Sequence, residues 1–216
     1  MDPSPHLFDR GAGGACVFIP SGEEDLATAA AIFHEVSEST ERPFRLVFFP
    51  VQDWNRDLSP WKAEAIFQDR PFAGGADQTL RTLLESLVPD LGGDRPLLLG
   101  YSLSGLFCLW ALTKTEVFFG AGSCSGSLWF PDFPAYLTIH PPRHGAHIYL
   151  SLGDREEKTH NPHLRSIGDN TRSIHAALSK REDYTVSPLV MNRGNHFQGV
   201  PHRMALGILW LLNSFP

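Results

Sequence analysis

A serine stands in a setting suited to nucleophilic chemistry in the segment GYSLSG, residues 100–105. The small residues Gly100 and Ser104 lie two positions before and two positions after Ser102. This spacing is typical of a sharp, strained turn from a strand into a helix, which exposes the serine hydroxyl above the sheet. The usual final glycine is a serine here, with Gly105 one residue later. The pattern predicts that Ser102 is a nucleophile; the plainer alternative is a serine that only caps the helix.

A serine hydroxyl is unreactive without a base, which an acid orients in turn. His196 lies in the segment NRGNHF, residues 192–197, and is the only one of the 10 histidines between the last predicted strand and the last predicted helix. His202 falls inside that helix, where a surface or capping position is expected. We therefore expect His196 to be the base, with a structural histidine as the alternative.

Three carboxylates compete for the role of the acid. The segment LGDREE, residues 152–157, follows an apolar strand that precedes the histidine in the chain. A Gly-x-x-acid placement selects Glu156, and Asp154 and Glu157 stay open as alternatives. The unused members would be carboxylates at the start of a helix, where the helix dipole favours them.

Stabilising an oxyanion requires two backbone N–H groups. The N–H of Leu103, directly after the serine, is the first candidate. The second is expected from the loop after the strand that neighbours the serine strand in a doubly wound sheet. Proline has no N–H, so Ser21 or Gly22 would donate rather than Pro20.

The elements that must position these residues are short apolar strands alternating with helices. Several strands are apolar on both faces, as parallel strands covered on both sides are. This alternation predicts an α/β protein with a doubly wound, mostly parallel sheet of about six strands in the order 2-1-3-4-5-6 and helices on both faces. The predicted strands cover residues 15–20, 44–51, 96–101, 118–123, 147–152 and 184–191. The predicted helices cover residues 21–39, which begins with a capping box, and 76–88, 104–113, 163–179 and 200–213.

One connection, residues 52–75, is too long for a simple turn and contains Trp54 and Trp61. Long loops in compact domains are usually lids or binding loops, so we expect a lid or substrate-binding role, with a surface excursion as the alternative. Trp54, Trp61, Trp129 and Phe130 are candidates for the substrate pocket. Each could instead belong to ordinary packing.

The composition favours one globular domain spanning residues 1–216 and excludes several partners. A net charge of -6 gives no reason to expect nucleic acid or an anionic membrane. No apolar run is long enough to span a membrane, and the first 14 residues do not resemble a signal peptide. The three cysteines lie in runs of apolar or small residues, which predicts that they are buried. Buried free thiols are typical of proteins in a reducing cytoplasm. Nothing favours a particular oligomeric state.

A metal site is the first rival interpretation, because His140, His144 and His147 are clustered. Pro141 and Pro142 break any helix between the first two, and no carboxylate or cysteine completes the set. We expect neither a metal nor an organic cofactor.

With these pieces together, the chain resembles the small bacterial esterases of the esterase D and enterochelin-esterase group within the α/β-hydrolases. The resemblance rests on the segments DWNRDLSPW (53–61), GYSLSGLFCLW (100–110), SGSLWFP (125–131), SLGDREEKTHNP (151–162) and RGNHFQG (193–199). It implies the α/β-hydrolase fold, with Ser102 as nucleophile and His196 as base. The third residue is less uniform in the siderophore-esterase branch, so the acid stays open. The chain is shorter than many relatives, without the two leading strands or an added N-terminal domain, so no substrate class is carried over.

The expected activity is hydrolysis of a small-molecule carboxylic ester through an acyl-enzyme intermediate. Two alternatives remain. An acyltransferase or peptidase would use the same three residues with another acceptor or substrate. A hydrolase fold without activity would serve as a binding protein, because a fold does not fix a function.

Overall fold

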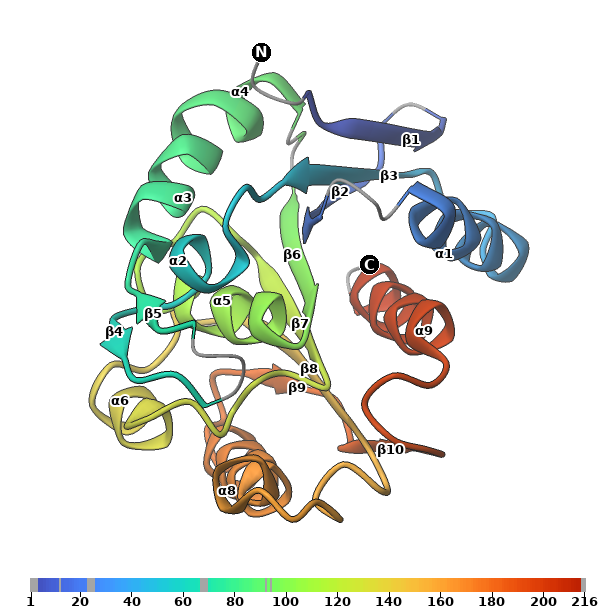
Figure 1. Cartoon of the computed structure of the whole chain (residues 1–216). Coiled ribbons are helices and arrows are strands. Elements are labelled where there is room, and N and C mark those ends of the chain that lie inside the picture. Colours follow the sequence, from blue (N-terminus) through green and yellow to red (C-terminus); the bar gives the residue numbers. More distant parts are fainter. Residues whose placement is uncertain are drawn as a thin grey trace.

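The computed structural model describes residues 4–11, 13–22, 26–66, 70–91, 93 and 95–214. These residues form one eight-stranded sheet with helices on both faces, as Figure 1 shows. The predicted α/β architecture, with a mostly parallel sheet between helices, is confirmed. None of the described helices is both long and apolar enough to cross a lipid bilayer.

The sheet runs in the order β1-β3-β2-β6-β7-β8-β10, with β9 paired to β8. Every pair is parallel except β1 with β3. The strands are β1 (His6–Arg10), β2 (Ala15–Ser21), β3 (Phe44–Pro50), β6 (Pro96–Tyr101), β7 (Gly120–Cys124), β8 (His147–Gly153), β9 (Thr185–Val186) and β10 (Val190–Asn192). Apart from β1, this order is the predicted one, with β6 beside β2 where the strand order reverses.

Two strands differ from the expectation. Strand β1 was not predicted, because HLFDR is short, mostly exposed and forms only by antiparallel pairing with the distant β3. It also corrects the expectation that both leading strands would be missing. The predicted strand 184–191 is divided into β9 and β10 around Pro188, which cannot donate to a ladder.

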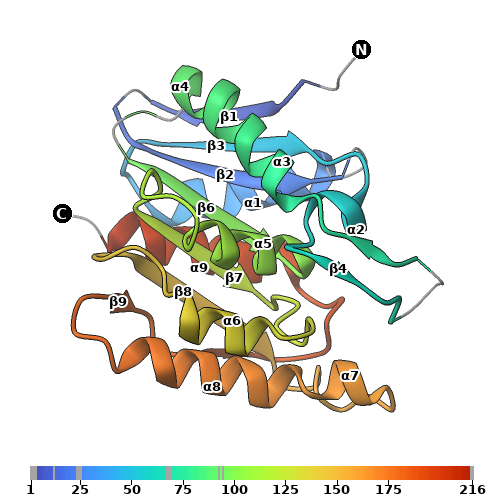
Figure 2. The same cartoon turned by 90° about the vertical axis from the view of Figure 1, so that its left-hand side faces the viewer.

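The helices form one layer on each face of the sheet, in front of it and behind it in the view of Figure 2. Helices α1 (Leu26–Ser39) and α9 (Val200–Asn213) pack side by side on one face. The other face carries α3 (Ala76–Thr82), α5 (Leu103–Ala111), α6 (Phe133–Ile139) and α8 (Ile167–Ser179). Every residue of α5 is buried, as its apolar composition predicted. The helix that follows the Ser102 turn is therefore held firmly within the core.

Some predicted helix boundaries change. The helix expected over 76–88 continues through a π-helical segment, η1 (Leu83–Leu87), into α4 (Val88–Leu91). The helix expected over 163–179 is divided into α7 (Pro162–Arg165) and α8. Ser21 ends β2 instead of opening a helix, and residues 23–25 of the capping box lie outside the described residues.

The long connection 52–75 contains α2 (Trp54–Asp57) and a small hairpin of β4 (Lys62–Ala63) and β5 (Phe72–Ala73). Residues 67–69 lie outside the described residues. Asp53 caps α2 by accepting a hydrogen bond from the N–H of Arg56. Ser59, fully buried, accepts from the Gly74 N–H, so the two ends of the connection are held together.

Candidate active site

The turn between β6 and α5 has the strained geometry that its spacing predicts. The backbone of Ser102 adopts φ 58° and ψ -124°, a conformation that residues other than glycine rarely adopt. A Cβ on Gly100 would lie 2.3 Å from the carbonyl carbon of Ser104, so only glycine fits there. The Ser104 hydroxyl accepts from the Tyr101 N–H at 2.8 Å and donates to the Tyr101 carbonyl oxygen at 2.8 Å. The serine that replaces the usual glycine therefore bridges the strand end to the helix.

A continuous chain of hydrogen bonds joins Ser102, His196 and Glu156. The Ser102 Oγ lies 3.0 Å from Nε2 of His196, and Nδ1 of His196 lies 2.7 Å from Oε2 of Glu156. A carboxylate can only accept, so Nδ1 carries the proton and Nε2 accepts from the serine hydroxyl. The three residues come from the ends of β6, β10 and β8, segments far apart in the sequence.

The Glu156 carboxylate is buried and saturated with donors. Its Oε1 accepts from the Gly153 N–H at 2.7 Å, from the Ser125 hydroxyl at 2.7 Å and from the Arg203 guanidinium at 2.8 Å. Burial raises the pKa of Glu156, but the hydrogen bonds to His196 and Ser125 outweigh it and hold the pKa below its ordinary value of 4.5. The group is therefore an ionised acceptor at neutral pH.

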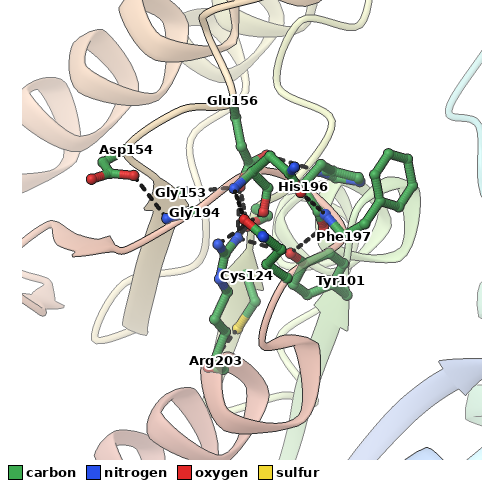
Figure 3. A network of polar contacts seen from close by, with 12 residues as sticks. Tyr101, Cys124, Gly153, Asp154, Glu156, Gly194, His196, Phe197 and Arg203 are labelled. Atoms are coloured by element: carbon green, nitrogen blue, oxygen red, sulfur yellow. Dashed lines mark hydrogen bonds and ion pairs between the residues drawn. The ribbon is translucent and has the colours of Figure 1, made fainter.

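The two alternative acids lie elsewhere. Asp154 accepts a hydrogen bond from the Gly194 N–H at 2.8 Å and holds the loop that carries the histidine. Glu157 pairs with Arg172 on the surface at 2.6 Å. Of the three carboxylates, Glu156 is the one in contact with His196, as Figure 3 shows.

Of the residues predicted to donate to an oxyanion, Leu103 is the one that lies at this turn. Leu103 opens α5, and the first backbone N–H groups of a helix have no partner within it. Ser21 ends β2, the strand beside β6, and Gly22 follows it, but neither lines the cavity over Ser102. Ser127, which was not singled out from the sequence, is 2% exposed and its Oγ lies 3.4 Å from that of Ser102.

A cavity of about 560 Å³ opens over Ser102 and His196. Its walls are mainly apolar and aromatic, and two exposed cations also line it. The apolar walls include Trp54, Phe72, Leu103, Trp129, Leu164, Ile167 and Phe197, and the cations are Arg155 and Lys158. Phe197, next to the histidine, is 86% exposed, so the cavity is open to solvent at this edge.

Two of the predicted pocket residues do not line this cavity. Trp61 donates from Nε1 to the Pro131 carbonyl oxygen at 3.2 Å and packs against the ring of Phe130. Phe130 is fully buried and contacts Phe72, which does line the cavity. Trp61 and Phe130 therefore support the wall from behind, which was the packing alternative.

Arg203 is the other residue that the sequence analysis missed. It lies on α9 among the buried residues Met204, Ala205, Gly207 and Ile208, and its guanidinium reaches Glu156. In the sequence, Arg203 is a charged residue on the otherwise apolar face of the helix predicted over 200–213. This departure from the pattern was the signal that could have identified it. Among the described residues, no group of three or more His, Cys, Asp or Glu side chains is arranged to hold a metal ion.

No protein-family model matches the sequence, and no curated protein matches it. Solved structures do match in fold. The siderophore hydrolase EstB from Aspergillus nidulans superposes with a TM-score of 0.74 at 15% identity, covering 99% of this chain and 96% of its own. The siderophore hydrolase EstA of the same organism gives 0.72 at 19% identity, with 98% and 90% covered. An IroE-like serine hydrolase from Shewanella oneidensis gives 0.71 at 19% identity, with 94% and 72% covered. The chain therefore shares the fold of these hydrolases.

Proposed function

We propose that this protein is a serine carboxylic-ester hydrolase. The observation that carries the proposal is the chain of hydrogen bonds from Ser102 through His196 to the ionised Glu156, placed at the cavity. The distances of 3.0 and 2.7 Å are within the reach that proton transfer and orientation of the base require. The esterases and serine hydrolases among the structural neighbours support the same conclusion.

The reaction proceeds in two steps. His196 Nε2 takes the proton of Ser102 as Oγ attacks the ester carbonyl carbon, and the imidazolium then protonates the departing alcohol. A water molecule, deprotonated by the same nitrogen, hydrolyses the acyl-enzyme and returns the serine. Glu156 keeps the proton on Nδ1 and stabilises the imidazolium. The N–H of Leu103, with that of Ser21 or Gly22, stabilises the oxyanion in both steps.

The substrate in this proposal is a small-molecule ester whose acyl or alcohol part is held by the apolar walls. Trp54 and Trp129 are its contacts, and the connection 52–75 acts as a substrate-binding loop through Trp54 and Phe72. Residues 1–216 act as one domain. The three cysteines are free and buried, which fits the reducing cytoplasm that we propose as the compartment.

A panel of esters tests the proposal. The panel contains p-nitrophenyl esters of short acids, feruloyl esters, acetylated sugars and catecholate siderophores, with a peptide amide as comparison. We expect hydrolysis of at least one ester by the wild type and none above background by Ser102→Ala. Amide cleavage alone would favour a peptidase, and equal rates for wild type and Ser102→Ala would contradict the proposal.

A further inference from the structure

A fully buried arginine lies directly beneath the proposed catalytic residues. Arg203 is 1% exposed, although arginine is almost never buried without a specific set of partners. It belongs to α9, on the face of the sheet opposite to α5, and its side chain rises toward Glu156, as Figure 3 shows. The mechanism above does not use it.

The guanidinium joins four segments of the chain. Its Nη1 donates to Glu156 Oε1 at 2.8 Å, to the Ser125 hydroxyl at 3.0 Å and to the Tyr101 hydroxyl at 3.0 Å. Its Nη2 donates to the carbonyl oxygens of Arg193 at 3.2 Å and Asn195 at 2.9 Å. One planar group thus holds the acid, the segment after β7, the end of the nucleophile strand and the loop before His196.

The same cluster also holds the backbone of His196. The Tyr101 hydroxyl, which accepts from Arg203, donates to the carbonyl oxygen of His196 at 2.7 Å. Tyr101 is also the residue immediately before the nucleophile. A displacement of the guanidinium would therefore shift Glu156 and the backbone of His196 together.

Arg203 also places a buried positive charge next to Glu156 and His196. The neighbouring Tyr101 phenol and Cys124 thiol are neutral, because burial raises the pKa of both, that of Cys124 to about 12. The other charged groups nearby, on the loop after β8 and the loop before α9, are Asp154, Arg155, Lys158 and Arg193, which reach solvent. A positive charge at this distance opposes uptake of a proton by Glu156.

We propose that Arg203 is a positioning residue for the esterase site. It fixes Glu156 and the His196 loop in one geometry, and its charge favours the ionised form of Glu156. A buried ion pair is a poor device for stability alone, because desolvation offsets the attraction. Five hydrogen-bond contacts, shared among the four N–H groups of Nη1 and Nη2 on one rigid fork, are instead suited to fixing geometry. This inference rests on the proposed function.

The test measures how fast a fluorophosphonate probe labels Ser102 between pH 5 and 9, which requires no knowledge of the natural ester. In Arg203→Met the charge is gone, so Glu156 takes up a proton at higher pH. The midpoint of the acid limb should rise by about one pH unit or more. Arg203→Lys keeps the charge but cannot make the five bonds. Its midpoint should stay near that of the wild type, while the labelling rate falls about ten-fold or more.

Arg172→Met is the matched control, because Arg172 pairs with the adjacent carboxylate Glu157 on the surface; labelling should not change. Circular dichroism checks that each variant is folded. A folded Arg203→Met with the wild-type midpoint would overturn the proposal. If that variant does not fold, Arg203→Lys decides, and a wild-type labelling rate in it would overturn the proposal. Absence of labelling in the wild type would instead refute the proposed function and this inference with it.

Discussion

The carbonyl group of Ser104 lies directly against Gly100. A Cβ on residue 100 would fall 2.3 Å from the Ser104 carbonyl carbon and 2.4 Å from its oxygen, both of them backbone atoms. The turn that presents Ser102 depends on this approach, since the helix begins where the strand has only just ended. The contact therefore ties a glycine in the strand to the position of the nucleophile.

Gly100→Ala should consequently impair both activity and stability. The backbone must shift to admit the methyl group, which costs roughly 1–3 kcal/mol in the free energy of unfolding and displaces Ser102. Urea unfolding and ester turnover measure the two effects. Gly145→Ala is the control, because a Cβ there meets nothing within 4 Å and only its positive φ of 74° is strained. Unchanged turnover in Gly100→Ala would contradict the role of this contact.

The catalytic acid can be identified by replacing each of the three carboxylates in turn and comparing the kcat of the variants. Glu156→Gln should lower kcat by roughly 10²- to 10⁴-fold, because the amide no longer stabilises the imidazolium or fixes the tautomer. Asp154→Asn should have a smaller effect, since Asp154 contacts only the loop. Glu157→Gln should leave kcat unchanged, because Glu157 pairs with a surface arginine. A larger loss in Asp154→Asn than in Glu156→Gln would reverse the assignment.

Acidification should destabilise the wild type through Glu156. Its folded pKa lies below the ordinary 4.5 of the unfolded chain, so below that pH the unfolded state takes up a proton that the folded state does not. The stabilisation is present above pH 4.5 and is lost as the pH falls through the folded pKa. Glu156→Gln lacks this dependence. The free energy of unfolding, measured at pH 6 and pH 4, should fall more in the wild type than in the variant; an equal fall would rule out the lowered pKa.

Ser127 should contribute to turnover through its contact with the nucleophile. Its Oγ lies 3.4 Å from that of Ser102, and its N–H donates to the Ser102 carbonyl oxygen at 2.9 Å. Ser127→Ala should lower kcat by about ten-fold with little change in KM, because the hydroxyl that steers the attacking oxygen is lost. Ser187→Ala, at an equally buried serine that accepts from the Leu150 N–H, should reduce stability without changing kcat. Wild-type kcat in Ser127→Ala would remove the residue from the mechanism.

Much of the fold could be predicted from the sequence, because its strands are short apolar runs and α5 is apolar all round. Strand β1 could not be predicted, since its exposed residues carry no pattern and only pairing with β3 makes it a strand. The prediction of one strand over 184–191 did not take into account that Pro188 has no N–H to donate to a neighbouring strand. These differences concern the edges of the sheet, where local patterning is weakest.

For the site, motif spacing predicted Ser102, His196 and the segment containing Glu156, and the structure brings these residues into contact. The choice among adjacent carboxylates depends on which side chain the turn after β8 directs inward, and spacing alone does not determine that. Ser127 and Arg203 reach the site from the segments after β7 and in α9, so only the tertiary structure brings them in. Ser127 belongs to the segment 125–131 on which the family resemblance partly rests, and Arg203 to the helix predicted over 200–213, but neither residue carried a predicted role.

The central claim is that Ser102 is the nucleophile, and covalent labelling tests it most directly. The protein is treated with a fluorophosphonate, digested, and the modified peptide is sequenced by mass spectrometry, alongside Ser102→Ala. We predict a single adduct on Ser102 in the wild type and no adduct in the variant. An adduct on another residue, or labelling that persists in Ser102→Ala, would contradict the account.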